Sequence, residues 1–417
     1  MSVSNIDPSQ RISSLDFLRG IAILGILIIN IESFAYSNPW SDYRYGFETA
    51  TDVTTRFWVY FLAQGKFWGM LTILFGAGFY LLLNKLEQKQ ATQKIAVTPY
   101  VIYSKRLLWL FVIGVAHAYL LWDGDILYHY AACGVFLMLF RSFNVKTLLL
   151  IILIPITVVA FNKLDRVYSK ADKYLTYTQL KTMDESDLSD EQSSIISRWE
   201  RRHSPSEKRA DKDPSERTSY IESIKANASN TNVHKGTFYY RSIVFQTLML
   251  MLVGVVFCKL GIFKNYRSVK YYWPLTLTFL SFALWVNYHR YYHWTFTSHE
   301  PVVTLSQGLM HTFPRELLAI AYILFFNGVY QQFIKRKYVV AIESVGKMAL
   351  TNYLSQSLIC SLIFYGYGLN YFNQLSRFEL LPIVFGISIF TLLFSYFWIK
   401  RFSIGPVESW WRKRIYH

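Results

Sequence analysis

Long apolar segments recur along the chain and are separated by short polar loops. About ten of them reach the roughly 17–25 residues that a helix needs to cross a bilayer. They are residues 17–36, 57–84, 107–122, 124–140, 147–163, 241–261, 272–290, 302–333, 345–366 and 379–399. Because apolar runs of this length are typical of membrane-spanning helices, the pattern predicts an all-α, polytopic membrane protein of about ten transmembrane helices.

Two of these segments are too long for one straight crossing. Gly65 interrupts the second segment and Pro314 interrupts the eighth. We predict that each is a short outer helix or re-entrant piece followed by a span. The first segment is predicted to stay as an anchor, because Asp16 and Arg19 at its start and the lack of a small-residue cleavage site do not fit a signal peptide.

A hydrophilic stretch, residues 165–240, divides the apolar segments into two groups. It predicts three parts: an N-terminal transmembrane bundle over residues 1–164, a hydrophilic extracytoplasmic loop, and a C-terminal transmembrane bundle over residues 241–417. Within the loop, residues 184–202 and 205–225 are candidates for charged surface helices. The loop is either a solvated, partly ordered segment or a lid that recognises an acceptor.

The net charge of +16 is mainly a topology signal. The 165–240 stretch contains 13 Lys/Arg and 13 Asp/Glu, so the whole excess belongs to the rest of the chain. One alternate set of short loops holds most of it: Lys85, Lys89, Lys94, Lys105, Arg106, Arg141, Lys146, Lys264, Arg267, Lys270, Lys335, Arg336, Lys337, Lys400, Arg401, Arg412, Lys413 and Arg414. The other set has Arg44, Arg56, Arg290 and Arg377. The basic set is therefore predicted to be cytoplasmic, as are both termini.

Composition narrows the function classes further. Charged residues make up 17% of the chain, against about 25% in soluble proteins, and the cations are dispersed over membrane-flanking loops, which disfavours nucleic-acid binding. We predict a multi-pass protein of the bacterial cytoplasmic (inner) membrane. Sequence motifs of nucleotide-driven pumps, dinucleotide enzymes and zinc proteases are absent, and no metal is predicted. The cysteines, Cys133, Cys258 and Cys360, lie in separate apolar runs and are expected to be buried small hydrophobes.

Ionisable residues inside membrane spans are costly, so each is a candidate functional residue. Asp16 and Arg19 open the first span and are three residues apart, close enough to meet on one helical face. They form either a local cap and ion pair or a site at which Arg19 binds a phosphate or polar cofactor arm from the cytoplasm. Asn30 lies three turns further along on roughly the same side and extends this polar track.

Two more polar groups lie in the second and ninth spans. Lys66 follows Gly65 at the outer end of the second span. It either extends to the membrane interface or stabilises an anionic intermediate or an acidic acceptor group. In the ninth span, Asn352, Tyr353 and Gln356 share one helical face. This face either makes hydrogen bonds between helices or lines a ligand tunnel.

The densest polar group surrounds a predicted outer turn between the third and fourth spans. His117 precedes this turn, and Asp123 and Asp125 lie within it. A histidine oriented by a carboxylate is a common general-base arrangement. The alternatives are a polar turn with a capping Asp and a packed histidine, or a His/Asp metal site with no distinctive spacing. His311 with Glu316 is a weaker second candidate for acid/base chemistry.

Taken together, these motifs resemble the YeiB-like family of bacterial membrane proteins. The resemblance lies in Arg11–Gly20 with Asn30, Gly65–Phe67, Leu74–Gly76, His117–Asp125, Gly346–Ser357 and Gly405–Glu408. The first motif is also similar to the start of heparan-alpha-glucosaminide N-acetyltransferase. The resemblance implies a transmembrane acyltransferase that moves an acyl group from cytoplasmic acyl-CoA, in particular acetyl-CoA, to a sugar or other envelope acceptor at the outer face.

The sequence departs from the glucosaminide enzyme at one position that matters for chemistry. That enzyme has its catalytic histidine in the loop after the opening motif, whereas residues 31–56 of this chain contain no histidine. Either another histidine does this work, with His117 the best candidate, or the chemistry differs.

Under the acyltransferase hypothesis, His117 removes the acceptor proton, and Asp123 or Asp125 orients it. Either Lys66 or Tyr353 stabilises the developing oxyanion. The acyl-CoA arm is held by polar residues of the first and ninth spans, which are Asp16, Arg19, Asn30, Asn352, Tyr353 and Gln356.

The alternative is a transporter or flippase for an anionic or sugar-containing molecule. The same polar track would also line a solute pathway, although no inverted repeat is visible in the sequence. A non-catalytic membrane partner protein is a third option, and it explains the ionisable residues inside the spans less well. Acyl-CoA turnover would support the first hypothesis, and solute flux without covalent change would support the second.

Overall fold

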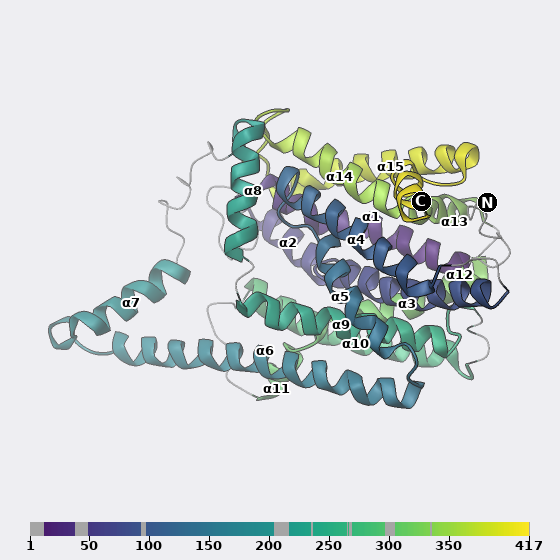
Figure 1. Cartoon of the computed structure of the whole chain (residues 1–417). Coiled ribbons are helices and arrows are strands. Elements are labelled where there is room, and N and C mark those ends of the chain that lie inside the picture. The colour runs from purple at the N-terminus through teal and green to yellow at the C-terminus, as the bar shows by residue number, and fades with distance from the viewer. Residues whose placement is uncertain are drawn as a thin grey trace.

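The structure, a computed structural model, describes residues 12–37, 49–92, 97–203, 217–234, 237–264, 266, 269–296, 305–333 and 336–416. All the regular elements in these residues are helices, which confirms the predicted all-α class (Figure 1). Several residues used in the sequence analysis lie outside the described ranges, namely Arg11, Arg44, Lys94, Arg267 and Lys335.

The first group of helices is α1 (Ser13–Ala35), α2 (Ala50–Leu62), α3 (Lys66–Ala91), α4 (Pro99–Leu120), α5 (Leu127–Phe140) and α6 (Val145–Lys181). Three short elements follow, η2 (Glu185–Asp187), α7 (Asp190–His203) and α8 (Tyr220–His234). The last group is α9 (Thr237–Lys259), α10 (Tyr272–Phe296), α11 (Leu305–Met310), α12 (Pro314–Phe333), α13 (Lys337–Lys347), α14 (Ala349–Phe364), α15 (Arg377–Phe402) and α16 (Pro406–Tyr416).

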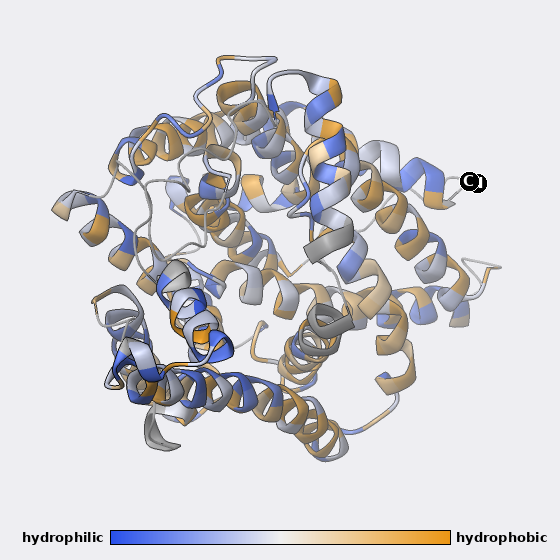
Figure 2. Cartoon of the chain, turned by 90° about the vertical axis from the view of Figure 1, so that its left-hand side faces the viewer, coloured by the Kyte–Doolittle hydropathy of each residue, from blue (hydrophilic) through white to orange (hydrophobic). Residues whose placement is uncertain are grey.

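Membrane-spanning length and composition are present in five parts of the described chain. These are Ser13–Ala35, Ala50–Ala91, Pro99–Leu120, Val145–Lys181 and Arg377–Phe402, beside shorter apolar helices at Leu127–Phe140, Ile243–Lys259 and Ala349–Phe364. Hydrophobic residues, orange in Figure 2, are spread along most of the helices. Large apolar side chains such as Leu150 and Phe385 are exposed to their surroundings, as expected for lipid-facing positions. A membrane protein is therefore supported, while the number of ten crossings, the inner membrane and the cytoplasmic side stay predictions.

The two helix breaks expected from the sequence are both present. α2 ends at Leu62, and α3 begins after Gly65, whose φ of +77° lies in the left-handed region that glycine tolerates best. A Cβ atom at Gly65 would also lie 2.5 Å from Cδ of Arg315. Pro314 is the first residue of α12 and follows the short α11, as suits a residue with no backbone N–H.

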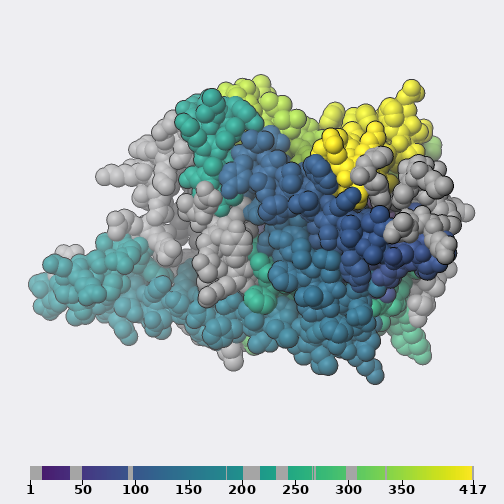
Figure 3. Space-filling model, viewed as in Figure 1, coloured from purple at the N-terminus to yellow at the C-terminus, as the bar shows by residue number. Residues whose placement is uncertain are grey.

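The hydrophilic stretch begins inside a helix rather than after one. α6 continues through the predicted boundary at residue 164 to Lys181 and projects from the bundle with α7 (Figures 1 and 3). Tyr177 of α6 packs on Trp199 of α7 with ring centres 5.6 Å apart. Glu200 accepts a hydrogen bond from Lys181 Nζ at 2.6 Å, which lowers the pKa of the Glu200 carboxyl.

The predicted surface helices are found in part. Most of residues 184–202 is helical, as η2 and α7. Residues 205–216 of the second prediction lie outside the described ranges, and α8 begins at Tyr220 within its remaining part. α8 lies across the end of the bundle opposite α16 (Figure 1). Asn227 of α8 donates from Nδ2 to the carbonyl of Tyr119 at 3.4 Å, which holds α8 on the end of α4.

Glycines join the first and last groups of helices by letting backbones touch. A Cβ atom at Gly20 of α1 would lie 2.1 Å from the carbonyl oxygen of Ile342 in α13, and one at Gly346 would lie 1.7 Å from that of Asp16. Between α3 and α9, a Cβ at Gly76 would lie 1.9 Å from the carbonyl oxygen of Met251. Such contacts are typical of tightly packed membrane helices.

The contact at Gly76 predicts the effect of adding one methyl group. We expect Gly76→Ala to destabilise the protein by about 1–3 kcal/mol, because neither backbone can move without disturbing the packed helices. Gly386→Ala is the matched control, since Gly386 is also helical and a Cβ atom there would meet no described atom within 4 Å. Unfolding in mixed micelles measures both. Equal stability of the two variants would contradict the close approach of α3 and α9.

Candidate functional site

A buried histidine and aspartate meet where α4 turns into α5. The Nδ1 of His117 lies 2.7 Å from Oδ2 of Asp125, and both side chains are almost completely buried. The other carboxylate oxygen, Oδ1, accepts the backbone N–H groups of Leu127 at 2.8 Å and Tyr128 at 3.2 Å. One carboxylate therefore caps the first turn of α5 and also fixes the orientation of the imidazole.

The opposite nitrogen of His117 faces a different environment. Its Nε2 is buried and has no hydrogen-bond partner among the described residues. The ring packs against Tyr353 of α14, with ring centres 5.2 Å apart, and against Trp122 at 6.2 Å. An imidazole that is held through Nδ1, and whose Nε2 makes no hydrogen bond, has the arrangement of a general base.

Asp123, the other predicted carboxylate, does not join this pair. Its side chain is partly exposed and lies 3.7 Å from a guanidinium nitrogen of Arg217, in the segment just before α8. Arg217 in turn lies over the ring of Tyr365, 4.4 Å from its centre. Asp123 thus helps to attach the α8 segment to the bundle, and Asp125 is the carboxylate in contact with His117.

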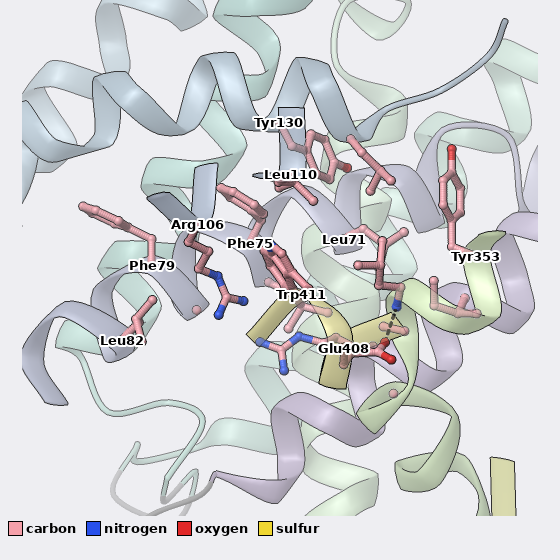
Figure 4. A pocket seen from close by; sticks show the side chains of 18 of the residues that line it. Leu71, Phe75, Phe79, Leu82, Arg106, Leu110, Tyr130, Tyr353, Glu408 and Trp411 are labelled. Atoms are coloured by element: carbon pink, nitrogen blue, oxygen red, sulfur yellow. Dashed lines mark hydrogen bonds between the residues drawn. The ribbon is translucent and has the colours of Figure 1, made fainter. Parts of the chain in front are cut away.

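A cavity of about 240 Å³ lies between α16 at one end and Tyr353, the ring neighbour of this histidine, at the other. Its walls come from α1, α3, α4, α5, α13, α14 and α16, and include Ile23, Leu71, Leu74, Phe75, Phe79, Tyr103, Leu110, Ile126, Leu127, Tyr130, Leu350 and Tyr353. Tyr353 lies at one end of the view in Figure 4, and Phe79 and Leu82 lie at the other. Neither His117 nor Asp125 lines the cavity, but Tyr353 in its wall packs against the ring of His117, so the cavity lies next to the buried pair.

The cavity wall is rich in cations. Its basic residues are Arg19, Arg106, Lys347 and Arg412, and its acidic residues are Asp16 and Glu408. Asp16 pairs with Arg19 at 3.0 Å, as the spacing predicted. Glu408 accepts the N–H groups of Leu350 at 2.8 Å and Thr351 at 3.0 Å, and so caps α14. With one carboxylate paired and the other used as a cap, this wall favours an anionic ligand.

Several cavity residues were not predicted as site residues. The guanidinium carbon of Arg106 lies 4.2 Å from the ring centre of Trp411, and the two side chains lie side by side in Figure 4. In the sequence, Arg106 and Arg412 have the same appearance as any membrane-flanking cation. Glu408 lies in the Gly405–Glu408 motif. This motif was the one feature of the sequence to indicate that α16 belongs to the site.

The remaining polar residues of the first and ninth spans hold helices together. Asn352 donates from Nδ2 to the Val345 carbonyl at 3.0 Å and to Ser395 Oγ of α15 at 2.8 Å. Gln356 donates to the Ile23 carbonyl of α1 at 3.3 Å. Neither of them lines the cavity, nor does the half-buried Asn30. Both interpretations of the polar face of the ninth span therefore apply in part. Asn352 and Gln356 make hydrogen bonds between helices, and Tyr353 lines the cavity.

Lys66 belongs to a separate buried cluster. Its Nζ donates to the Tyr60 carbonyl at 2.7 Å and lies 3.9 Å from the ring centre of Tyr291, and its side chain is fully buried rather than extended to an interface. Nearby, Glu316 accepts a hydrogen bond from Lys163 Nζ at 2.9 Å. The structure thus places Lys66 apart from His117, and it gives Glu316 a lysine partner.

The other chemically distinctive residues have structural surroundings. His129 Nε2 lies 2.9 Å from Thr247 Oγ1 of α9, and Cys133 and Cys360 are buried while Cys258 is partly buried. In the described part of the chain, no three His, Cys, Asp or Glu side chains gather in a way that would hold a metal ion.

Known proteins resemble this chain along almost its full length. Residues 257–417 match the family model described as "Protein of unknown function (DUF418)". The uncharacterized protein YeiB of Escherichia coli (strain K12) is 29% identical over 97% of this chain and 96% of its own length. The uncharacterized protein YxaH of Bacillus subtilis (strain 168) is 25% identical over 99% of this chain and 97% of its own.

The full-length similarity to YeiB and YxaH and the match to DUF418 support the YeiB-like family. This confirms the family resemblance found in the motifs, whereas the link to transmembrane acyltransferases stays a prediction. The match to DUF418 covers α10 to α16 and the end of α9, so it includes Tyr353 and Glu408 but not His117. No solved structure matches the YeiB-like chain.

The double role of Asp125 predicts unequal effects of removing the two aspartates. We expect Asp125→Ala to destabilise the protein by about 2–4 kcal/mol, because it removes a helix cap and leaves a buried histidine unpaired. Asp123→Ala is the matched control and should cost less than about 1 kcal/mol, because its ion pair is partly exposed. Unfolding in mixed micelles measures both. A larger loss for Asp123→Ala would show that the carboxylates have been assigned the wrong way round.

Proposed function

We propose that this YeiB-like protein is a membrane-embedded acyltransferase that takes an acyl group, in particular acetyl, from cytoplasmic acyl-CoA and moves it to an envelope acceptor. The observation that carries the proposal is the cavity, whose wall holds cations and also Tyr353, the residue that packs against the buried His117. A donor that has phosphates at one end and an apolar acyl group at the other matches a cavity with both cationic and apolar lining.

The size of the cavity limits how the donor is held. A volume of about 240 Å³ is below the roughly 300–1,000 Å³ of pockets that enclose a drug-sized ligand. We infer that only the acyl thioester and the adjoining arm enter, while the nucleotide stays at the cationic mouth. There, Arg19, Arg106 and Arg412 supply planar donors suited to phosphate oxygens.

The chemistry follows from the positions of three side chains. The Nε2 of His117 removes the proton from an acceptor hydroxyl or amine, which then attacks the thioester carbonyl. Asp125 stabilises the imidazolium that forms, and the Tyr353 hydroxyl is the nearest candidate to donate to the developing oxyanion. When the C–S bond breaks, the imidazolium returns the proton to the CoA sulfur, and the products are the acylated acceptor and free CoA.

Removal of the proposed base gives the most direct test. We expect His117→Ala to lower acyl transfer by about 100–10,000-fold with little change in acyl-CoA affinity, because a general base acts on the acceptor proton. The measurement is transfer of labelled acetyl from acetyl-CoA to envelope lipids and glycans by protein in nanodiscs. His129→Gln is the control, since His129 is also a buried histidine but contacts Thr247. Wild-type rates in His117→Ala would exclude this base.

The cationic mouth predicts a separate effect on donor affinity. Arg106→Ala and Arg412→Ala should each weaken acyl-CoA binding about tenfold or more, with a smaller change in kcat, since charge-assisted hydrogen bonds contribute about 1.5–3 kcal/mol. Lys413→Ala is the control, because Lys413 is an exposed cation of the helix that carries Arg412 and does not line the cavity. Equal affinity in all three variants, or solute flux across proteoliposomes without acyl transfer, would instead favour the transporter hypothesis.

A further inference from the structure

A second, larger cavity opens on the side of the bundle. This lateral groove has a volume of about 950 Å³. Its lining residues come from α1, α2, α3, α10, α12 and α15 and the turn before α3; those used below are Thr51, Thr54, Thr55, Trp58, Phe67, Leu284 and Phe378. Apart from three threonines, the lining is apolar or aromatic. Its walls include Ala50–Ala91 and Arg377–Phe402, both long and apolar enough to cross a membrane, and Trp58 and Phe378 in its wall are about half exposed. These features are the ones expected of a groove on a lipid-facing side of the bundle.

Polarity changes along the groove in one direction. Its lining starts on α2 with Thr51, Thr54 and Thr55, at the end of the bundle opposite α16, and continues with apolar residues as far as Phe67 of α3. Behind the threonine end lies a buried ion pair, in which Arg377 Nε is 3.5 Å from Glu32 Oε2. A polar end toward the membrane surface and an apolar body toward its middle match an amphiphile oriented like a lipid of that leaflet.

The groove approaches the cavity of the candidate site at one helix contact. Phe67 lines the groove, and Leu71, one turn further along the same face of α3, lines the cavity. The ring of Phe67 packs against α1 at Gly25, where a Cβ atom would lie 2.4 Å from the ring. This contact separates a groove that opens to lipid from a cavity that opens at the α16 end.

The polar end of the groove and the proposed base lie toward the same end of the bundle. Phe34, near the end of α1, stacks on Trp122 with ring centres 4.9 Å apart, and Trp122 contacts the ring of His117. The outer end of α1 is thus in contact with the turn that carries Asp125. Thr51 and Thr54 begin the helix that follows α1.

We propose that the lateral groove binds the hydrocarbon chain of a membrane lipid and that the acyl acceptor is lipid-linked, reaching the site sideways from the bilayer. This deepens the proposed function and rests on it. A hydroxyl or amine of the lipid head group is the nucleophile. Its new bond to the acyl carbon replaces the C–S bond of the thioester, and its proton ends on the CoA thiol.

Photolabelling tests the lipid site directly. The full chain is reconstituted in vesicles of phosphatidylethanolamine and phosphatidylglycerol with a phospholipid that carries a diazirine in its acyl chain, and labelled peptides are mapped after irradiation. Label is expected on α2, α10 and α12. Leu284→Trp, which fills the groove from α10, should reduce that label about tenfold, whereas Leu277→Trp on the same helix but outside the groove should not. Equal label in the two variants, or label spread evenly over α6, would overturn the lipid site.

Acyl transfer in the same variants tests the identity of the acceptor. If the acceptor is lipid-linked, Leu284→Trp loses transfer to lipid extracts about tenfold while it still binds acyl-CoA. Full transfer by Leu284→Trp to a water-soluble sugar would overturn the lipid-linked acceptor and leave the proposed acyltransferase standing. Absence of any transfer by the wild-type protein, with groove labelling intact, would overturn the proposed function and leave the lipid site standing.

Discussion

The close approach of α1 to α13, made possible by Gly20 and Gly346, is the contact on which the candidate site depends. It brings the first span against the helix that precedes α14, so that Arg19 and Lys347 line one cavity although more than three hundred residues separate them. Without Cβ atoms, the two backbones meet directly and no side chains keep the helices apart. The glycines of α3 and α9 repeat this arrangement and complete the packing behind the cavity wall.

Within this frame, the proposed chemistry depends on a turn of a few residues. The tight connection from α4 to α5 brings Asp125 into contact with His117, and the aromatic side chains of Trp122 and Tyr353 pack against the imidazole. Since the same carboxylate caps α5, the orientation of the histidine is tied to helix formation rather than to a mobile side chain. Such preorganisation is what a catalytic group requires before substrate arrives.

The apolar pattern was enough to predict the helical class and the breaks at Gly65 and Pro314, because both follow from local chemistry. It also brought out His117 and its carboxylates, which are close in sequence. What could not be predicted were contacts between distant spans. Asn352 and Gln356 make hydrogen bonds to α15 and α1, and Lys66 lies in another cluster, although each had the same polar signature as Tyr353. A polar residue in a span indicates that a hydrogen-bond or ion-pair partner is needed. The sequence does not identify that partner when it lies on a distant span.

The cap that Glu408 places on α14 bears on how the protein matures. The N–H groups of Leu350 and Thr351, in the turn just before Tyr353, donate to the carboxylate of Glu408 in α16, the last described helix. Spans enter the membrane in order during synthesis, so His117 and Asp125 are in place long before that cap exists. A partly synthesised chain thus holds the histidine and aspartate but lacks a finished cavity. Completion of the cavity therefore requires α16, which is synthesised long after the turn that carries Asp125.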